Sequence, residues 1–275
     1  MKLQVQGREA YAYTGGKPFD AALPSIVFIH GAINDHGSFT LLARWFAHHG
    51  WGVLAPDLPG HMRSAGPALA SVEAMADWLL ALLDAAGVEQ AALAGHSLGS
   101  LAALEAASRA PERITRLVML GTAVPMPVPA VLLDLGKTDP LAAIDRVVMY
   151  SHSTLAAKPS YPGPGVWLRG GARALMRQVL AHGRDPMLFH TDFSACDRYA
   201  RGDEAAARVR CPAHLVLAQF DHMTPPQAAR DLAAALKATV HRVPAGHYLM
   251  QECPDAVLTA MRAALASEPV LIESG

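Results

Sequence analysis

The chain has 275 residues, of which 52% are hydrophobic and 17% are charged, and its formal net charge is -1. This composition supplies a large apolar core and excludes an intrinsically disordered protein. Neither a basic stripe nor a block of like charge stands out. We therefore expect the partner to be a small-molecule substrate rather than nucleic acid or an anionic membrane surface.

The termini and cysteines favour a cytoplasmic protein. The first residues, 1–9, lack the apolar core of a signal peptide, and no stretch reaches the roughly 20 uninterrupted apolar residues of a membrane span. The three cysteines, Cys196, Cys211 and Cys253, are widely spaced, so neither a disulfide framework nor a Cys-x-x-Cys metal site is expected. The oligomeric state stays open, with a homodimer as one arrangement.

Strands and helices alternate up to about residue 120. We predict a hairpin over 2–6 and 9–13, strands over 25–29, 51–55, 90–94 and 114–120, and helices over 39–48, 71–86 and 98–109. The run 25–29 reads Ser-Ile-Val-Phe-Ile, which is typical of a parallel strand buried on both faces. The alternation predicts an α/β fold with a mostly parallel sheet that is flanked by helices.

This alternation stops after the fourth parallel strand and resumes much later. Between the predicted strands 114–120 and 213–218 we predict only helices, over 129–135, 140–150, 172–182 and 186–199. Strands over 213–218 and 239–243 and helices over 226–236 and 248–266 follow. Because the gap is far longer than a normal crossover, we predict a core of residues 1-123 and 209-275 and a helical cap, or lid, inserted at 124-208.

The segment Gly95-His96-Ser97-Leu98-Gly99 joins a predicted strand to a predicted helix and has the pattern G-x-S-x-G. In this context the pattern predicts a nucleophile elbow, a sharp turn that exposes a strained serine. Ser97 is therefore the candidate nucleophile. The glycines are expected because a Cβ at either position would collide with the neighbouring strand or helix.

Two backbone N–H groups are candidates for an oxyanion hole. Leu98 opens a helix, where N–H groups lack partners and carry partial positive charge. Ala32 ends the first parallel strand in His30-Gly31-Ala32, so its N–H can face Ser97 across the carboxyl edge of the sheet. His30 is interpreted as a structural hydrogen-bonding residue beneath this loop.

A serine hydroxyl needs a base, and the base needs an orienting acid. Asp221 follows the strand 213–218 and His247 follows the last strand, so both lie at the carboxyl edge in the chain order Ser, Asp, His. His222 is a weaker candidate for the base. Asp134 and Asp139 are substitute candidates for the acid, because the acid can come from a different strand end.

These stretches, together with Asp57-Leu58-Pro59-Gly60-His61, resemble the α/β-hydrolase superfamily. The resemblance covers about residues 25 to 265 apart from the cap, and implies the triad Ser97, Asp221 and His247, no cofactor, and a lid over an apolar pocket. Relatives usually read G-x-G-x-S after the second core strand, whereas this chain has Met62 at the second glycine. Methionine adopts positive φ less readily than glycine, which puts the local loop shape in doubt.

The function predicted is a carboxylesterase-like serine hydrolase that cleaves an ester-like bond of a small, largely apolar substrate by acyl transfer. A carbon–carbon bond hydrolase of aromatic breakdown, a lactonase, a transacylase or a cofactor-free perhydrolase would use the same triad. A small-molecule receptor with slow turnover is the alternative outside enzymes. A serine at the elbow argues against epoxide and haloalkane hydrolysis, which use a carboxylate nucleophile.

Substrate-binding residues are sought in the cap. The candidates are its aromatic residues Tyr161, Trp167, Phe189 and Phe193. No metal is expected, because the sequence has neither His-Glu-x-x-His nor a Cys/His cluster at ligand spacing.

Overall fold

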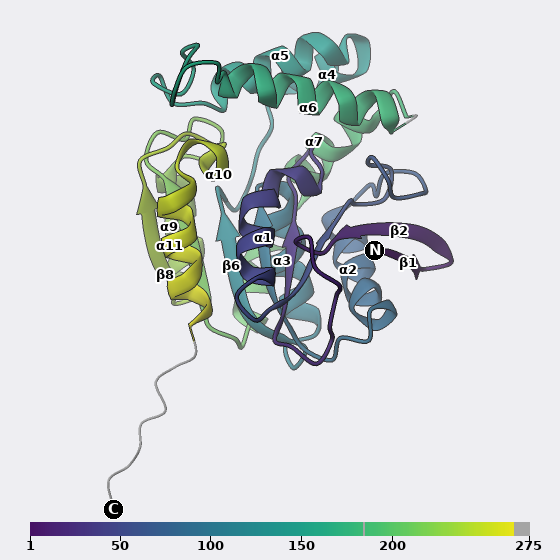
Figure 1. Cartoon of the computed structure of the whole chain (residues 1–275). Coiled ribbons are helices and arrows are strands. Elements are labelled where there is room, and N and C mark those ends of the chain that lie inside the picture. Colours follow the sequence, from purple (N-terminus) through teal and green to yellow (C-terminus); the bar gives the residue numbers. More distant parts are fainter. Residues whose placement is uncertain (184, 267–275) are drawn as a thin grey trace, which may run out of the picture.

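The computed structural model describes residues 1–183 and 185–266 and is organised around one eight-stranded sheet of order β1-β2-β4-β3-β5-β6-β7-β8 (Figure 1). The strands are β1 (Lys2–Val5), β2 (Arg8–Tyr13), β3 (Ser25–Ile29), β4 (Gly52–Pro56), β5 (Ala91–His96), β6 (Ile114–Leu120), β7 (Ala213–Ala218) and β8 (Thr239–Val243). β1 and β2 form the predicted antiparallel hairpin, and the strands from β4 to β8 are parallel. The predicted α/β fold with a mostly parallel sheet is confirmed.

Helices cover both faces of the sheet. On one face, α1 (Thr40–Ala47) and α11 (Pro254–Leu265) bury apolar side chains against β3, β4 and β6 to β8. On the other face lie α2 (Val72–Ala85), α3 (Leu98–Arg109) and α9 (Arg230–Ala235). Every residue of β3, β4 and β5 is buried, because these central strands are covered on both sides.

The register of the parallel strands places their carboxyl ends at one edge. Ile29 of β3 is paired with Gly95 of β5, and His96 of β5 is paired with Leu120 of β6. The segments that follow β3, β5, β7 and β8 therefore emerge side by side. This is the edge at which ligands bind in open α/β sheets.

Between β6 and β7 the chain forms helices α4 (Ala130–Thr138), α5 (Pro140–Tyr150), α6 (Leu168–His182), α7 (Leu188–Arg198) and α8 (Gly202–Arg208). Figure 1 shows α4, α5 and α6 as a layer above the sheet, from which α7 leads back to it. Helix α8 was not predicted, and it packs against α3 and α9. The division of the chain into a core and a cap stays a prediction, but the packing of α8 groups this helix with the core.

Two predicted helices near the C-terminal end are interrupted. The segment predicted as one helix over 248–266 is α10 (Leu249–Glu252) followed by α11, with the break at Cys253. Pro254 has no N–H to donate to the preceding turn and begins α11 instead. The predicted helix 226–236 starts as a 3₁₀ turn, η2 (Pro226–Ala229), before α9.

Met62 adopts φ 38° although it is not glycine. The loop after β4 is held around it, because the Ser64 hydroxyl donates to the backbone oxygen of Asp57 at 2.6 Å and accepts from the Tyr11 N–H at 3.0 Å. These bonds offset the cost of the left-handed backbone. None of the helices in the described ranges combines the length and the apolar character needed to cross a membrane.

Candidate active site

Ser97 lies on the sharp turn between β5 and α3, with φ 52° and ψ -119°. This left-handed backbone is strained for a residue with a side chain. A Cβ added to Gly95 would overlap the backbone of Gly99, and one added to Gly99 would overlap the backbone of Ile29. Both positions therefore require glycine, and the turn can pass close to β3 while presenting Ser97 at the carboxyl edge.

His247 and Asp221 are hydrogen-bonded to each other. His247 Nδ1 lies 2.8 Å from Asp221 Oδ2, and both side chains are almost completely buried. Asp221 also accepts the backbone N–H groups of Met223 and Thr224 and the Thr224 hydroxyl, each at 2.8 Å. Burial alone would raise the pKa of Asp221, but the charge and hydrogen bond of His247 and the bonds from Thr224 lower it. An ionised Asp221 keeps the imidazole proton on Nδ1 and leaves Nε2 available as a base.

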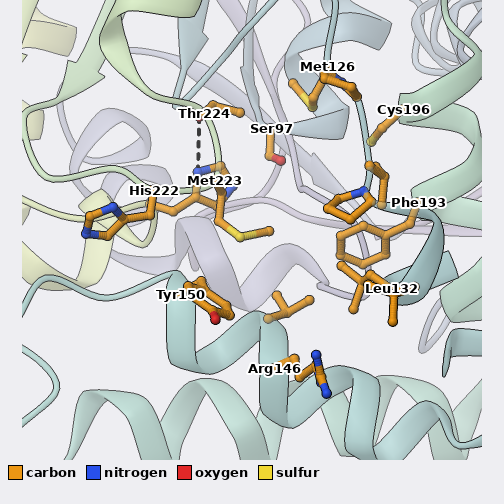
Figure 2. Close-up of a pocket in the computed structure, with 16 residues that line it drawn as sticks. Ser97, Met126, Leu132, Arg146, Tyr150, Phe193, Cys196, His222, Met223 and Thr224 are labelled. Atoms are coloured by element: carbon orange, nitrogen blue, oxygen red, sulfur yellow. Dashed lines mark hydrogen bonds between the residues drawn. The ribbon is translucent and has the colours of Figure 1, made fainter.

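Ser97 and His247 line the same cavity, into which the Ser97 side chain points (Figure 2). The described part of the chain contains no hydrogen bond between the Ser97 hydroxyl and the His247 ring. Such bonds are often long in a site without substrate and shorten when one binds. The structure thus brings the three predicted residues to one site, with the bond between Asp221 and His247 already formed.

A model of the family described as "alpha/beta hydrolase fold" matches residues 24–147, which include β3 to β6 and the Ser97 turn. Solved structures that resemble the chain in fold cover 96% to 97% of it. The chain has the α/β-hydrolase fold, and its residues 24–147 match the sequence model of that family.

The chain is similar to the following three proteins, which comprise two solved structures and one curated sequence. An enol-lactonase from Burkholderia xenovorans has a TM-score of 0.82 at 21% identity, with 97% of this chain and 100% of that chain covered. An esterase from Exiguobacterium antarcticum has a TM-score of 0.80 at 15% identity, with 96% and 98% covered. A curated sn-1-specific diacylglycerol lipase from Mus musculus is 37% identical over 102 residues, which are 37% of this chain and 33% of the lipase. The matches to two further curated proteins cover 36% of the length of each of those proteins.

Two backbone N–H groups at the predicted oxyanion hole have no acceptor among the described residues. Ala32 lines a narrow recess together with Ser97 and His247, and Leu98 is the first residue of α3. Within the described ranges, the N–H groups of Ala32 and Leu98 donate to no backbone or side-chain acceptor. Both groups are therefore available to a developing oxyanion, and their role stays a prediction.

The cavity beside Ser97 has a volume of about 440 Å³ and is mostly apolar. Its walls come from the segment after β6, from α4, α5 and α7, and from the segment after β7. The apolar lining includes Met126, Val128, Leu132, Val147, Phe193 and Met223. Arg146 and Tyr150 of α5 lie on the far side from Ser97 in Figure 2. An apolar cavity with few polar groups suits a small organic substrate.

Three of the four predicted pocket aromatics do not line this cavity. Phe193 does, whereas Phe189 is fully buried and stacks behind it, with ring centroids 4.4 Å apart. Trp167 is 46% exposed at the start of α6, and Tyr161 forms an isolated bridge with it. Tyr161, Trp167 and Phe189 therefore lie outside the lining of this cavity, because residue type does not say which side chains of the segment 124–208 face the sheet; their role in substrate binding stays a prediction.

The alternative acids and base occupy other positions. Asp134 lies on an exposed turn of α4 near Lys137, and Asp139 caps α5 by accepting the Ala142 N–H at 3.0 Å. Neither carboxylate lines the cavity. His222 does line it, on the side of Met223 (Figure 2).

Among the described residues, one group of side chains has donor atoms close enough to hold a metal ion. Atoms of Asp35, His36 and Asp57 lie within 4.8 Å of one another. The Asp57 oxygens already accept the His36 N–H, the His36 ring and the Arg63 N–H. Hydrogen bonding within the two loops therefore accounts for this cluster.

Sequence reasoning missed two residues that hold the candidate triad. Thr224 donates to Asp221 and its hydroxyl lies 3.2 Å from His247 Nδ1. His96, next to the nucleophile, donates from Nε2 to the backbone oxygen of His247 at 2.9 Å. Burial lowers the pKa of His96 to about 3, so the ring stays a neutral donor. The available signals were the positions of these residues inside the motifs: His96 directly precedes Ser97, and Thr224 follows Asp221 by three residues.

His30 is placed as predicted, beneath the oxyanion loop. Its Nε2 accepts the Leu58 N–H at 3.0 Å and its Nδ1 donates to the Gly31 oxygen at 2.9 Å. Burial lowers the pKa of His30 to about 4. The unfolded chain binds a proton here near pH 6.5, whereas the folded protein does not.

The free energy of unfolding is therefore expected to fall as the pH drops from 7 to 5, with His30 contributing about 2 kcal/mol of the fall. Urea denaturation of the wild type and of His30→Gln at both pH values measures this contribution. Glutamine can donate and accept but does not titrate, so the variant should lose less stability between pH 7 and pH 5. An equal loss of unfolding free energy in both proteins would contradict the contribution assigned to His30.

Proposed function

We propose that this protein is a serine esterase that cleaves an ester-like bond of a small, largely apolar substrate. The observation that carries the proposal is the strained Ser97 in one cavity with His247, whose other ring nitrogen is bound to Asp221. The names of the relatives, which include an esterase, a lipase and an enol-lactonase, are consistent with ester chemistry.

The reaction proceeds by acyl transfer. His247 takes the proton of Ser97 as Oγ attacks the carbonyl carbon, and the oxyanion accepts the N–H groups of Ala32 and Leu98. His247 then protonates the leaving alcohol, and an acyl ester remains on Ser97. Water, deprotonated by the same histidine, attacks this ester and releases the acid and the free serine.

Asp221 contributes by its charge and its position. It holds the imidazole with Nε2 toward the cavity and stabilises the imidazolium that forms in both steps. Because Asp221 already accepts three other hydrogen bonds, its carboxylate is fixed before substrate arrives. A fixed partner needs no reorganisation during the reaction.

The cavity supports a limit on substrate size. A volume of about 440 Å³ lies near the lower end of small-molecule pockets. We therefore favour esters with short acyl and alcohol groups over long-chain lipids. The enol-lactonase neighbour makes cyclic esters a second candidate class, in which the leaving alcohol stays attached to the acyl group.

The proposal is tested with an organophosphonate probe and a substrate panel. We expect one probe adduct per chain, located on Ser97 by peptide mapping, and hydrolysis of p-nitrophenyl butyrate in preference to the palmitate. Lactones form the second arm of the panel. Ser108→Ala is the matched control, since Ser108 lies further along α3 and its hydroxyl donates to the backbone oxygen of Glu105, away from Ser97. An adduct on another residue, or no turnover of any ester or lactone, would reject the proposal.

A further inference from the structure

Asp192 is a buried residue of α7 whose carboxylate accepts a hydrogen bond from the loop after β3. Its side chain is completely buried, and Oδ2 accepts the Ile33 N–H at 2.8 Å and a hydrogen from His61 Nε2 at 2.9 Å. The other oxygen, Oδ1, is buried without a hydrogen-bond partner among the described residues. A carboxylate in such a position is costly to bury, so its bonds to the loops call for an explanation.

The Ile33 N–H belongs to the peptide unit that directly follows Ala32, the proposed oxyanion donor. Ile33 adopts φ 52°, a left-handed backbone that a β-branched residue disfavours. On the other side of this peptide unit, Asn34 Nδ2 donates to the Ala32 oxygen at 2.9 Å. The orientation of the loop thus depends on two side chains, of which Asp192 comes from a helix far away in the sequence.

His61 completes a buried ion pair. Its Nδ1 lies 3.1 Å from the Pro59 oxygen and its Nε2 lies 2.9 Å from Asp192. Both neighbours are acceptors, so both ring nitrogens carry protons. Burial opposes this charge, but the charge and hydrogen bond of Asp192 raise the pKa of His61 overall. The pair joins α7 to the loops after β3 and β4 at once.

We propose that Asp192 is a positioning residue for the oxyanion hole: from α7 it holds the Ala32–Ile33 peptide unit so that the Ala32 N–H faces the carbonyl oxygen at Ser97. This inference rests on the proposed esterase function. It also makes the docking of a helix from the predicted cap a condition for transition-state stabilisation. Buried ion pairs add little stability compared with apolar residues of similar volume, so a positioning role accounts for the pair better than stability does.

The test separates positioning from stability with the double variant His61→Leu/Asp192→Leu. It removes both charges together and keeps apolar volume in their place, so it should lose less stability than Asp192→Leu alone, which leaves His61 charged and unpaired; only the loss of the Ile33 acceptor lowers its melting temperature. The Ile33 N–H loses its acceptor. We expect kcat for p-nitrophenyl butyrate to fall roughly 10- to 100-fold with KM changed by less than about 3-fold, because a misplaced oxyanion donor affects the transition state and not the bound ester.

A trifluoromethyl ketone gives a second readout, because its adduct with a serine carries an oxyanion. Its affinity should weaken by the same factor as kcat. Asp192→Asn keeps an oxygen that can accept the Ile33 N–H, so we expect it to restore most of the lost kcat. If the double variant does not fold, Asp192→Glu is tested instead, because it displaces the carboxylate by one methylene. We again expect kcat to fall while KM changes little.

Tyr199→Phe is the matched control. The Tyr199 hydroxyl donates to the buried Glu105 at 2.7 Å and ties the end of α7 to α3, away from the oxyanion loop. We expect this variant to lose stability without a change in kcat or inhibitor affinity. The inference is overturned if the double variant keeps its kcat, or if kcat falls equally in Tyr199→Phe. A wild type that hydrolyses no ester would instead reject the proposed function.

Discussion

Ser97→Ala is expected to lower kcat for ester hydrolysis by roughly 10⁴- to 10⁶-fold. The variant lacks the oxygen that forms the acyl intermediate, so only direct attack by water on a bound and polarised ester remains. Steady-state hydrolysis of p-nitrophenyl butyrate at saturating substrate measures the change. KM should be affected far less, because the apolar walls that bind the ester are intact.

The stability of Ser97→Ala separates loss of chemistry from loss of fold. Alanine meets the same left-handed strain at φ 52° as serine, so the melting temperature should change little. The Ser97 hydroxyl forms no hydrogen bond within the described ranges that alanine would remove. A folded variant with most of its activity left would eliminate Ser97 as the nucleophile.

Asp221→Asn is expected to lower kcat by roughly 10³- to 10⁴-fold near neutral pH. The substitution removes the negative charge that stabilises the imidazolium of His247. An asparagine amide that donates to Nδ1 also moves the ring proton to Nε2, where the base must be free. The measurement is kcat for p-nitrophenyl butyrate as a function of pH.

One other carboxylate provides a control for this prediction. Asp139→Asn changes the alternative acid, which caps α5 and lies outside the cavity lining, so it should retain wild-type kcat. A large loss of kcat in Asp139→Asn, together with an active Asp221→Asn, would indicate that the acid is Asp139, in the segment after β6, and not Asp221.

The sheet was predictable because its signals are local. The apolar run from Ile26 to Ile29 reflects the burial of a strand on both faces, the turn signals separate one element from the next, and the long gap after residue 120 marks where the alternation stops. Errors appeared where helices are weakly amphipathic or interrupted. Helix α8 is a short run of small and charged residues, and Pro254 divides a segment whose apolar periodicity continues through it.

The lining of the cavity was not predictable in the same way. Aromatic residues of the segment 124–208 were the natural candidates, yet Trp167 faces solvent and Phe189 lies in the interior. The lining comes instead from Met126 and Val128, among prolines after β6, from Leu132 of α4, and from α5. Which face of a short helix meets the sheet depends on packing against elements distant in the sequence.

Sequence alone determined the order of the parallel strands' motifs and the glycines that allow the turn at Ser97, and it made Asp221 and His247 the candidates for the acid and the base, because strand ends converge at one edge. Tertiary structure decided what surrounds them. The support of His247 by His96 and the ion pair of Asp192 with His61 join residues 151 and 131 positions apart. Contacts over such separations have no periodicity in the chain, since they depend on the three-dimensional placement of whole helices and loops.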